Sequence, residues 1–175
     1  MENTIEALQY PIGRFTLPVE VSSEEIKLAI GRIAILPSKI EAAIEGLSDT
    51  QLGNPYRPGG WTIRQVVHHL ADSHMNAFIR FKLALTEDAP VIKPYAEALW
   101  AAQQDYHLAP EISLAIIGHL HKRWIVLMES MTDADWERTF VHPQYNRVQK
   151  LCQTVMLYAW HGEHHLGHIR NAKSI

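Results

Sequence analysis

The chain has 175 residues, of which 47% are hydrophobic and 20% are charged. This is the usual size of one domain with its own core, so we treat residues 1–175 as a single domain. The 16 basic and 19 acidic side chains give a formal net charge of −3, which argues against a nucleic-acid or anionic-membrane partner. The one cysteine, Cys152, excludes an intrachain disulfide and a zinc site built from several cysteines.

The first part of the chain predicts an irregular arm followed by a long helix. Residues 1–20 form the arm, because prolines and a glycine interrupt any regular pattern. The helix begins near Ser22, where Ser22 and Glu25 match a capping box, and apolar residues then recur at helical spacing. Pro37 lies within this helix and predicts either a kink or a split.

The rest of the chain predicts further helices and almost no strands. The expected long helices are Thr62–Leu85, Pro110–Met128 and Val148–Ala172, with short helical pieces at Tyr95–Gln104 and Thr132–Trp136. Thr62 and Gln65 form a second capping box, and Pro110 suits a first helical turn. We therefore predict an all-α four-helix bundle with a long crossover between its second and third helices.

Histidine is the unusual feature of the composition. Of the 11 histidines, seven fall in the two windows 68–74 and 161–168, where an even spread would place about one. In the last helix, at about 100° per residue, His161 and His165 fall on the apolar face, one turn apart. Such a pair of imidazoles can bind one metal ion. The competing interpretation is a set of buried histidines hydrogen-bonded to their neighbours.

The first histidine window leaves the third ligand undecided. His74 falls in the middle of the apolar face of the second long helix, whereas His68 and His69 flank that face by similar angles. His69 shares its side with a polar strip, Ser73, Asn76 and Arg80, which could line a cleft. Periodicity alone does not choose between His68 and His69.

Two longer strings around these histidines resemble a known family. Residues 59–74 read GGWTIRQVVHHLADSH and residues 158–169 read YAWHGEHHLGHI. Together they resemble the DinB superfamily, in particular its YfiT-like branch, and the resemblance covers nearly the whole chain. It implies a four-helix bundle with a long crossover and one divalent metal ion per chain, zinc or nickel, held by His69, His161 and His165. The chain departs from the YfiT-like pattern at Gly162 and Glu163, which bears on substrate preference.

The same resemblance implies a cytoplasmic, homodimeric enzyme of the type described as a metal-dependent hydrolase. A divalent ion that lowers the pKa of a bound water would support hydrolysis of a small molecule. Related proteins transfer a low-molecular-weight thiol such as bacillithiol to electrophiles, and metal-assisted deprotonation of a thiol is the alternative chemistry. No secretory signal or apolar run of membrane-spanning length is visible, which agrees with a cytoplasmic protein without a membrane partner.

Residues that could assist catalysis are less sharply indicated than the metal ligands. Asn76 and Arg80 could hold the carboxylates of an anionic thiol, and His74 or Asp72 could serve as the base that hydrolysis requires. A non-enzymatic alternative is a metal-stabilised module for binding or dimerisation. A fourth protein ligand, for which His74 and His168 are the candidates, would favour that alternative.

Overall fold

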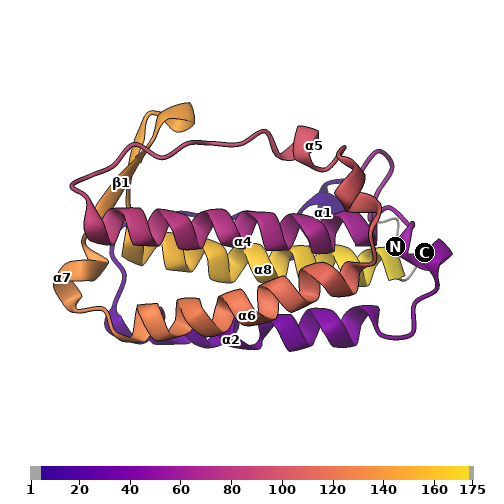
Figure 1. Ribbon diagram of the computed structural model, residues 1–175, viewed down its shortest axis with the longest axis horizontal. Helices are drawn as coiled ribbons and strands as arrows, with labels where there is room; N and C mark the ends of the chain where they lie inside the picture. The colour runs from indigo at the N-terminus through magenta and orange to yellow at the C-terminus, as the bar shows by residue number, and fades with distance from the viewer. Residues whose placement is uncertain (1–4, 174–175) are drawn as a thin grey trace.

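Four long helices make up most of the protein. The structure, a computed structural model, describes residues 5–173. The long helices are α2 (Ser23–Ile44), α4 (Ile63–Thr86), α6 (Pro110–Glu129) and α8 (Leu151–Lys173). Each of them packs against two others, α2 and α4 both contacting α6 and α8 (Figure 1). This arrangement confirms the predicted all-α four-helix bundle.

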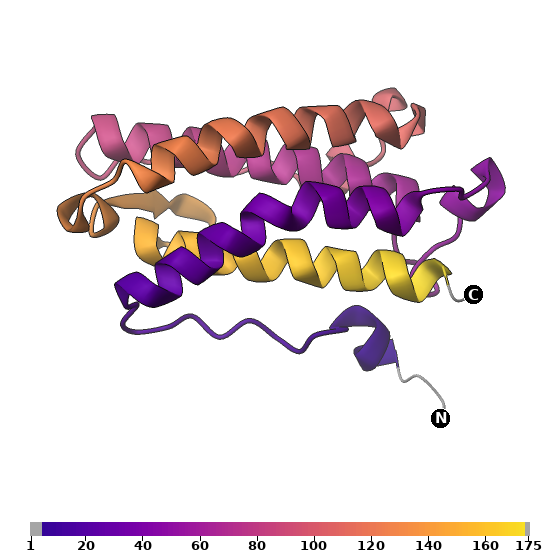
Figure 2. The ribbon, with the colours of Figure 1, turned by 90° about the horizontal axis from the view of Figure 1, so that it is seen from below.

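Three of the four predicted long-helix starts agree with the structure. Ser22 caps α2 and Thr62 caps α4, each in a reciprocal capping box with the residue three positions later. Such a cap satisfies two backbone N–H groups that the first turn leaves unpaired. Pro110 occupies the first turn of α6. Pro37 does not split α2, which continues as one bent helix (Figure 2).

The crossover between α4 and α6 runs back along the bundle (Figure 1). It contains the short helix α5 (Glu97–Trp100), which lies within the predicted helical piece Tyr95–Gln104, and a 3₁₀ turn, η1 (Gln104–His107), which begins at the last residue of that piece. Because this connection returns the chain to its starting end, α4 and α6 run in the same direction. The predicted long crossover is therefore present, and it lies over the face formed by α4 and α8.

Several short elements decorate the bundle. The described part of the arm, residues 5–20, includes the helix α1 (Ile5–Gln9), so it is less irregular than predicted. Helices α3 (Asp49–Leu52) and α7 (Asp133–Trp136) lie in connections. Strands β1 (Thr139–His142) and β2 (Arg147–Lys150) form an antiparallel hairpin around the 3₁₀ turn η2 (Pro143–Tyr145). The hairpin was not predicted, although burial alternates along β1. Because β2 takes residues 147–150, α8 begins at Leu151 rather than Val148.

The core is divided along the bundle axis. One apolar cluster, which we call the hairpin-side cluster, includes Phe81, Trp124 and Phe140. A second, the far-end cluster, includes Leu70 and Leu166. On α4, α6 and α8 the helical turns between the two clusters carry histidines, of which His74, His121 and His165 are buried and His161 is half-buried. We call these four residues and His69 the histidine layer.

None of the helices in the described part of the chain is long and apolar enough to cross a membrane.

Candidate metal centre

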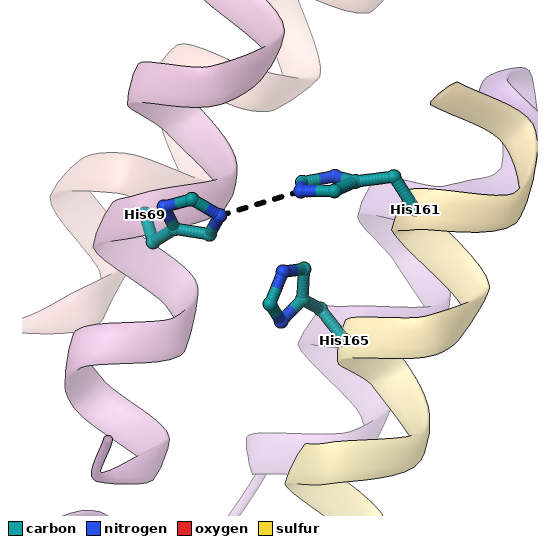
Figure 3. Close-up of side chains that lie close together, drawn as sticks. All are labelled: His69, His161 and His165. Carbon is teal, nitrogen blue, oxygen red and sulfur yellow. Dashed lines mark hydrogen bonds between the residues drawn. The ribbon is translucent and has the colours of Figure 1, made fainter. Parts of the chain in front are cut away.

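Three histidines from two antiparallel helices meet in the histidine layer. His69 lies on α4, and His161 and His165 lie one turn apart on α8 (Figure 3). One ring nitrogen from each lies within 4.8 Å of the other two. The closest pair is Nε2 of His69 and Nε2 of His161, 3.3 Å apart. The structure thus brings together the three residues predicted as metal ligands.

The structure places His68 away from this centre. Its Nδ1 lies 2.7 Å from Ser113 Oγ, and its Nε2 lies 3.0 Å from the carbonyl oxygen of Leu108. Both ring nitrogens therefore already have partners on α6 and on the segment that leads into it. His68 anchors the end of the crossover against α4, and its neighbour His69 is the histidine that faces α8.

The donor set fits a divalent metal ion. Burial is the main cause that lowers the pKa of His69 to about 4 and holds the pKa values of His161 and His165 well below 6.5, and nearby histidines add to the effect. All three rings are therefore neutral at pH 7, which is the form that binds a metal. Within the described residues no carboxylate or thiol joins this group. Three imidazoles without a fourth protein ligand are typical of an open, catalytic site.

The two histidines considered as a fourth ligand have other partners. Nε2 of His74 lies 3.4 Å from Nδ1 of His161, and its Nδ1 lies 2.9 Å from Nε2 of His121. Nδ1 of His168 lies 3.2 Å from Nδ1 of His165, and its Nε2 lies 3.1 Å from the Gln9 carbonyl oxygen. Neither side chain offers a ring nitrogen to the centre.

His121 is a member of the layer that the sequence did not reveal. It is buried on α6, and its Nδ1 lies 2.8 Å from the carbonyl oxygen of Ile33 on α2. One signal was available, because His121 falls at helical spacing between the buried residues Ile117 and Trp124. A histidine inside an apolar stripe indicates a buried polar contact, but the spacing does not say with which helix.

A cavity of about 230 Å³ opens beside His161. Its walls come from α4 and α8, and the arm, the crossover and the hairpin cover it. Ser73 and Arg80 of the predicted polar strip line it, and Arg80 donates a hydrogen bond of 3.2 Å to Tyr158 Oη. The crossover adds the carboxylate of Glu97, a residue that the sequence did not single out. Partial burial raises the pKa of Glu97, and the nearby Arg80 opposes that rise.

Three other residues considered for catalysis are not among those that line this cavity. Asn76 donates its side-chain amide to the Asp72 carbonyl oxygen, 2.9 Å away. Asp72 itself accepts a hydrogen bond of 2.6 Å from Tyr106 Oη. His74 lies behind His161, fully buried. Of the residues proposed from the sequence for catalysis, the structure therefore places only Arg80 in the cavity.

A second cavity, of about 390 Å³, reaches the centre from another direction. It is lined by His165 and His168 of α8, by Arg57 and Trp61 of the loop before α4, and by Tyr10 of the arm. Trp61 also packs on His69, with ring centroids 4.6 Å apart. One cavity therefore reaches His161 and the other reaches His165.

The two positions at which the sequence departs from the YfiT-like pattern face α2. Gly162 lies against the side chain of Leu36, and Glu163 forms an ion pair of 2.6 Å with Lys39. Neither residue is among those that line the two cavities. Nothing in their surroundings links them to substrate preference.

A family profile, two related sequences and a solved structure all relate this chain to the same family. A sequence profile of the DinB superfamily matches residues 33–169. Proteins of Bacillus mycoides (strain KBAB4) and Bacillus licheniformis, each bearing the name "Putative metal-dependent hydrolase", are 49% and 46% identical over 95% of both chains. The chain superposes with a TM-score of 0.94 on YfiT from Bacillus subtilis, described as a probable metal-dependent hydrolase with an unusual four-helix bundle topology. The identity is 44%, over 96% of this chain and 97% of that one.

Proposed function

Because this chain belongs to the DinB superfamily, we propose that it is a metal-dependent enzyme that hydrolyses a small molecule. The observation that carries the proposal is the convergence of His69, His161 and His165 beside a cavity. These three side chains would hold the metal, zinc or nickel, since imidazole suits both. When bound, such an ion acts as a Lewis acid and lowers the pKa of a coordinated water or thiol.

The cavity supplies groups for binding and proton transfer. Arg80 is fixed by its hydrogen bond to Tyr158, so its guanidinium can bind an anionic or carbonyl oxygen of the substrate. Glu97 shares the cavity, and its raised pKa brings the carboxyl group closer to the neutral range, where a general base is most effective. Glu97 would accept the proton that a water molecule loses as it attacks the substrate. The cavity volume suits a substrate of modest size.

The first test is metal content followed by hydrolysis. Protein loaded with zinc or with nickel, and metal-free protein, would be assayed with panels of esters, amides and phosphoesters. We expect turnover that needs the metal, that disappears in His161→Ala, and that falls in Glu97→Gln while the metal content stays at one per chain. Absence of turnover above that of the metal-free protein on every panel would overturn the hydrolase proposal.

A second function, thiol transfer, is favoured by the second cavity. Transfer needs space for a thiol and for an electrophile, and two cavities reach the ligand pair on α8. Arg57 in the second cavity offers a positive charge to an anionic thiol such as bacillithiol. Incubation of metal-loaded protein with low-molecular-weight thiols and monochlorobimane tests this alternative. Metal-dependent conjugation would support it, and no conjugation with any thiol would exclude it.

The remaining expectations stay predictions. A module that binds a metal only for stability or dimerisation predicts a fourth protein ligand, and neither His74 nor His168 offers one. Light scattering would test the predicted homodimer. Fractionation of cells that produce the protein would test the predicted cytoplasmic location.

A further inference from the structure

A chain of hydrogen bonds links His161 to the backbone of α2, and we call it the inner relay. It runs from Nδ1 of His161 to Nε2 of His74 (3.4 Å), then from Nδ1 of His74 to Nε2 of His121 (2.9 Å). It ends where Nδ1 of His121 meets the carbonyl oxygen of Ile33 (2.8 Å). His74 and His121 are fully buried, so water does not compete for these bonds.

The carbonyl group at the end of the inner relay decides where each proton lies. A carbonyl oxygen only accepts, so Nδ1 of His121 must carry the hydrogen. In a neutral ring the other nitrogen is then an acceptor, and burial lowers the pKa of His121 to about 4. Nε2 of His121 therefore accepts from Nδ1 of His74, and Nε2 of His74 accepts from Nδ1 of His161. Nε2 of His161 is left with its lone pair, on the side of His69.

A shorter chain, the outer relay, applies the same rule to His165. Nε2 of His168 lies 3.1 Å from the carbonyl oxygen of Gln9 and must donate to it. Nδ1 of His168 then accepts from Nδ1 of His165, 3.2 Å away. Nε2 of His165 is left with its lone pair, and one ring nitrogen of His165 lies on the side of His69 and His161 (Figure 3). Gln9 ends α1, so the arm helps to orient a ligand.

We propose that the inner and outer relays fix the tautomers of His161 and His165, so that Nε2 of each presents its lone pair to the metal. His74, His121 and His168 are then positioning residues, acting through hydrogen bonds rather than by binding the metal or the substrate. Partners of this kind hold ligating histidines in the productive tautomer and raise metal affinity. The inference rests on the proposed metal site for its effect on affinity, but the tautomers exist in the metal-free protein too.

His69 provides an internal contrast. Its Nδ1 is buried and has no hydrogen-bond partner among residues 5–173, so no relay fixes its tautomer. In the metal-free protein its Nε2 would donate to the lone pair of His161, 3.3 Å away. His69 is thus the ligand whose proton must move when a metal binds, whereas the two α8 ligands are prepared in advance.

The tautomers can be measured directly. Long-range proton–nitrogen spectra of metal-free protein with ¹⁵N-labelled histidine report which ring nitrogen carries the hydrogen. We expect the hydrogen on Nδ1 in both His161 and His165. His121→Leu should shift the tautomer of His161 and leave His165 unchanged, and His168→Leu should do the reverse, so each variant is the control for the other.

Metal affinity is the second measurement. Competition with a chelator should show that His121→Leu and His168→Leu each weaken zinc or nickel binding by about 10–100-fold. His68→Leu is the matched control, because it removes a buried histidine with two partners outside the relays, and it should leave affinity unchanged. His121→Gln, whose amide can both accept and donate, should restore most of the affinity.

Each outcome decides the proposal. A hydrogen on Nε2 of His161 or His165 in the unmodified protein would overturn it, and so would relay variants whose affinity falls no further than that of His68→Leu. If a leucine variant does not fold, the tautomers of the unmodified protein and the behaviour of His121→Gln still decide. If the unmodified protein binds no metal, the proposed function fails, while the spectra of the metal-free protein still test the relays.

Discussion

The histidine layer and the apolar clusters on either side of it use the same inward helix faces in different ways. In the far-end cluster, Leu70 and Leu166 are fully buried and only need to fill space. In the layer, His74 and His121 are equally buried, but each needs a partner at a defined nitrogen. The clusters therefore stabilise the fold, while the hydrogen bonds of the layer hold imidazole rings in fixed orientations.

The largest effect on stability is expected in the far-end cluster. Leu166→Ala removes a fully buried side chain next to His165, and a cavity of this kind costs about 2–5 kcal/mol. Urea unfolding would measure the loss. The affinity of the remaining folded protein for zinc should stay within about threefold of the unmodified value. If Leu166→Ala lowered zinc affinity as much as the loss of a ligand does, the far-end cluster would affect metal binding as well as stability, which contradicts the comparison.

His165→Ala should show the reverse of Leu166→Ala, with a large loss of metal affinity and a smaller change in stability. A structural zinc site with four ligands contributes about 10–16 kcal/mol, so one ligand accounts for about 3 kcal/mol, or roughly 100-fold in affinity. Chelator competition would measure this loss. Glu163→Gln is the control on the same helix, because Glu163 pairs with Lys39 on the side facing α2 and such a partly exposed pair contributes less than about 1 kcal/mol. Equal affinities in the two variants would refute the assignment of His165.

The buried histidines of the layer should make the free energy of unfolding depend on pH, which the apolar side chains of the clusters do not. Burial lowers the pKa of His121 to about 4 and that of His74 well below 6.5. The unfolded chain, whose histidines titrate near 6.5, then binds more protons than the folded chain below that pH. The stability that these neutral histidines contribute is therefore complete above pH 6.5 and is lost as pH falls towards 4. Each histidine contributes a slope of up to about 1.4 kcal/mol per pH unit.

Urea unfolding of metal-free protein between pH 7.5 and pH 5 would measure this slope. His121→Gln removes one titrating group, so its stability should fall less steeply by up to about 1.4 kcal/mol per pH unit. The test is independent of any metal. Identical slopes for the two proteins would show that His121 does not titrate in this way.

The smallest expected effect concerns the contact between α8 and α2. A methyl group on Gly162 would lie 3.2 Å from Cδ1 of Leu36 and closer still to Cδ2, and Leu36 is almost fully buried. Gly162→Ala should therefore cost about 1–3 kcal/mol by overpacking. Because His161 is the adjacent residue, a shift of α8 would also weaken metal binding. Gly118→Ala, where the same methyl group meets no described residue within 4 Å, is the control in urea unfolding.

If Gly162→Ala lowers stability but leaves metal affinity unchanged, the layer tolerates movement of α8 against α2. If stability and metal affinity fall together, the geometry of the histidine layer depends on the close contact between Gly162 and Leu36. A variant as stable as the unmodified protein would show that Leu36 can move aside.

Sequence periodicity determined which residues face inward, and it identified His161 and His165 as a pair on one face of α8. This was possible because helix starts and helix faces depend on local spacing and caps, as at Ser22 and Thr62. The hairpin was missed, because its strands are only four residues each and the first two residues of β2 are exposed. Helical spacing places His164 off the apolar face of α8, yet it is buried, because Trp160 and Tyr10 of the arm pack against its ring.

Only the tertiary structure decided what each inward or flanking histidine contacts. His68 and His69 are neighbours with similar angles to the apolar face, yet one bonds to Ser113 and the other faces α8. The partner of His121 is the carbonyl oxygen of Ile33, which lies on another helix, within hydrogen-bond distance of Nδ1. Local spacing fixes the face of a helix on which a side chain lies, whereas its partners depend on how helices distant in sequence pack together.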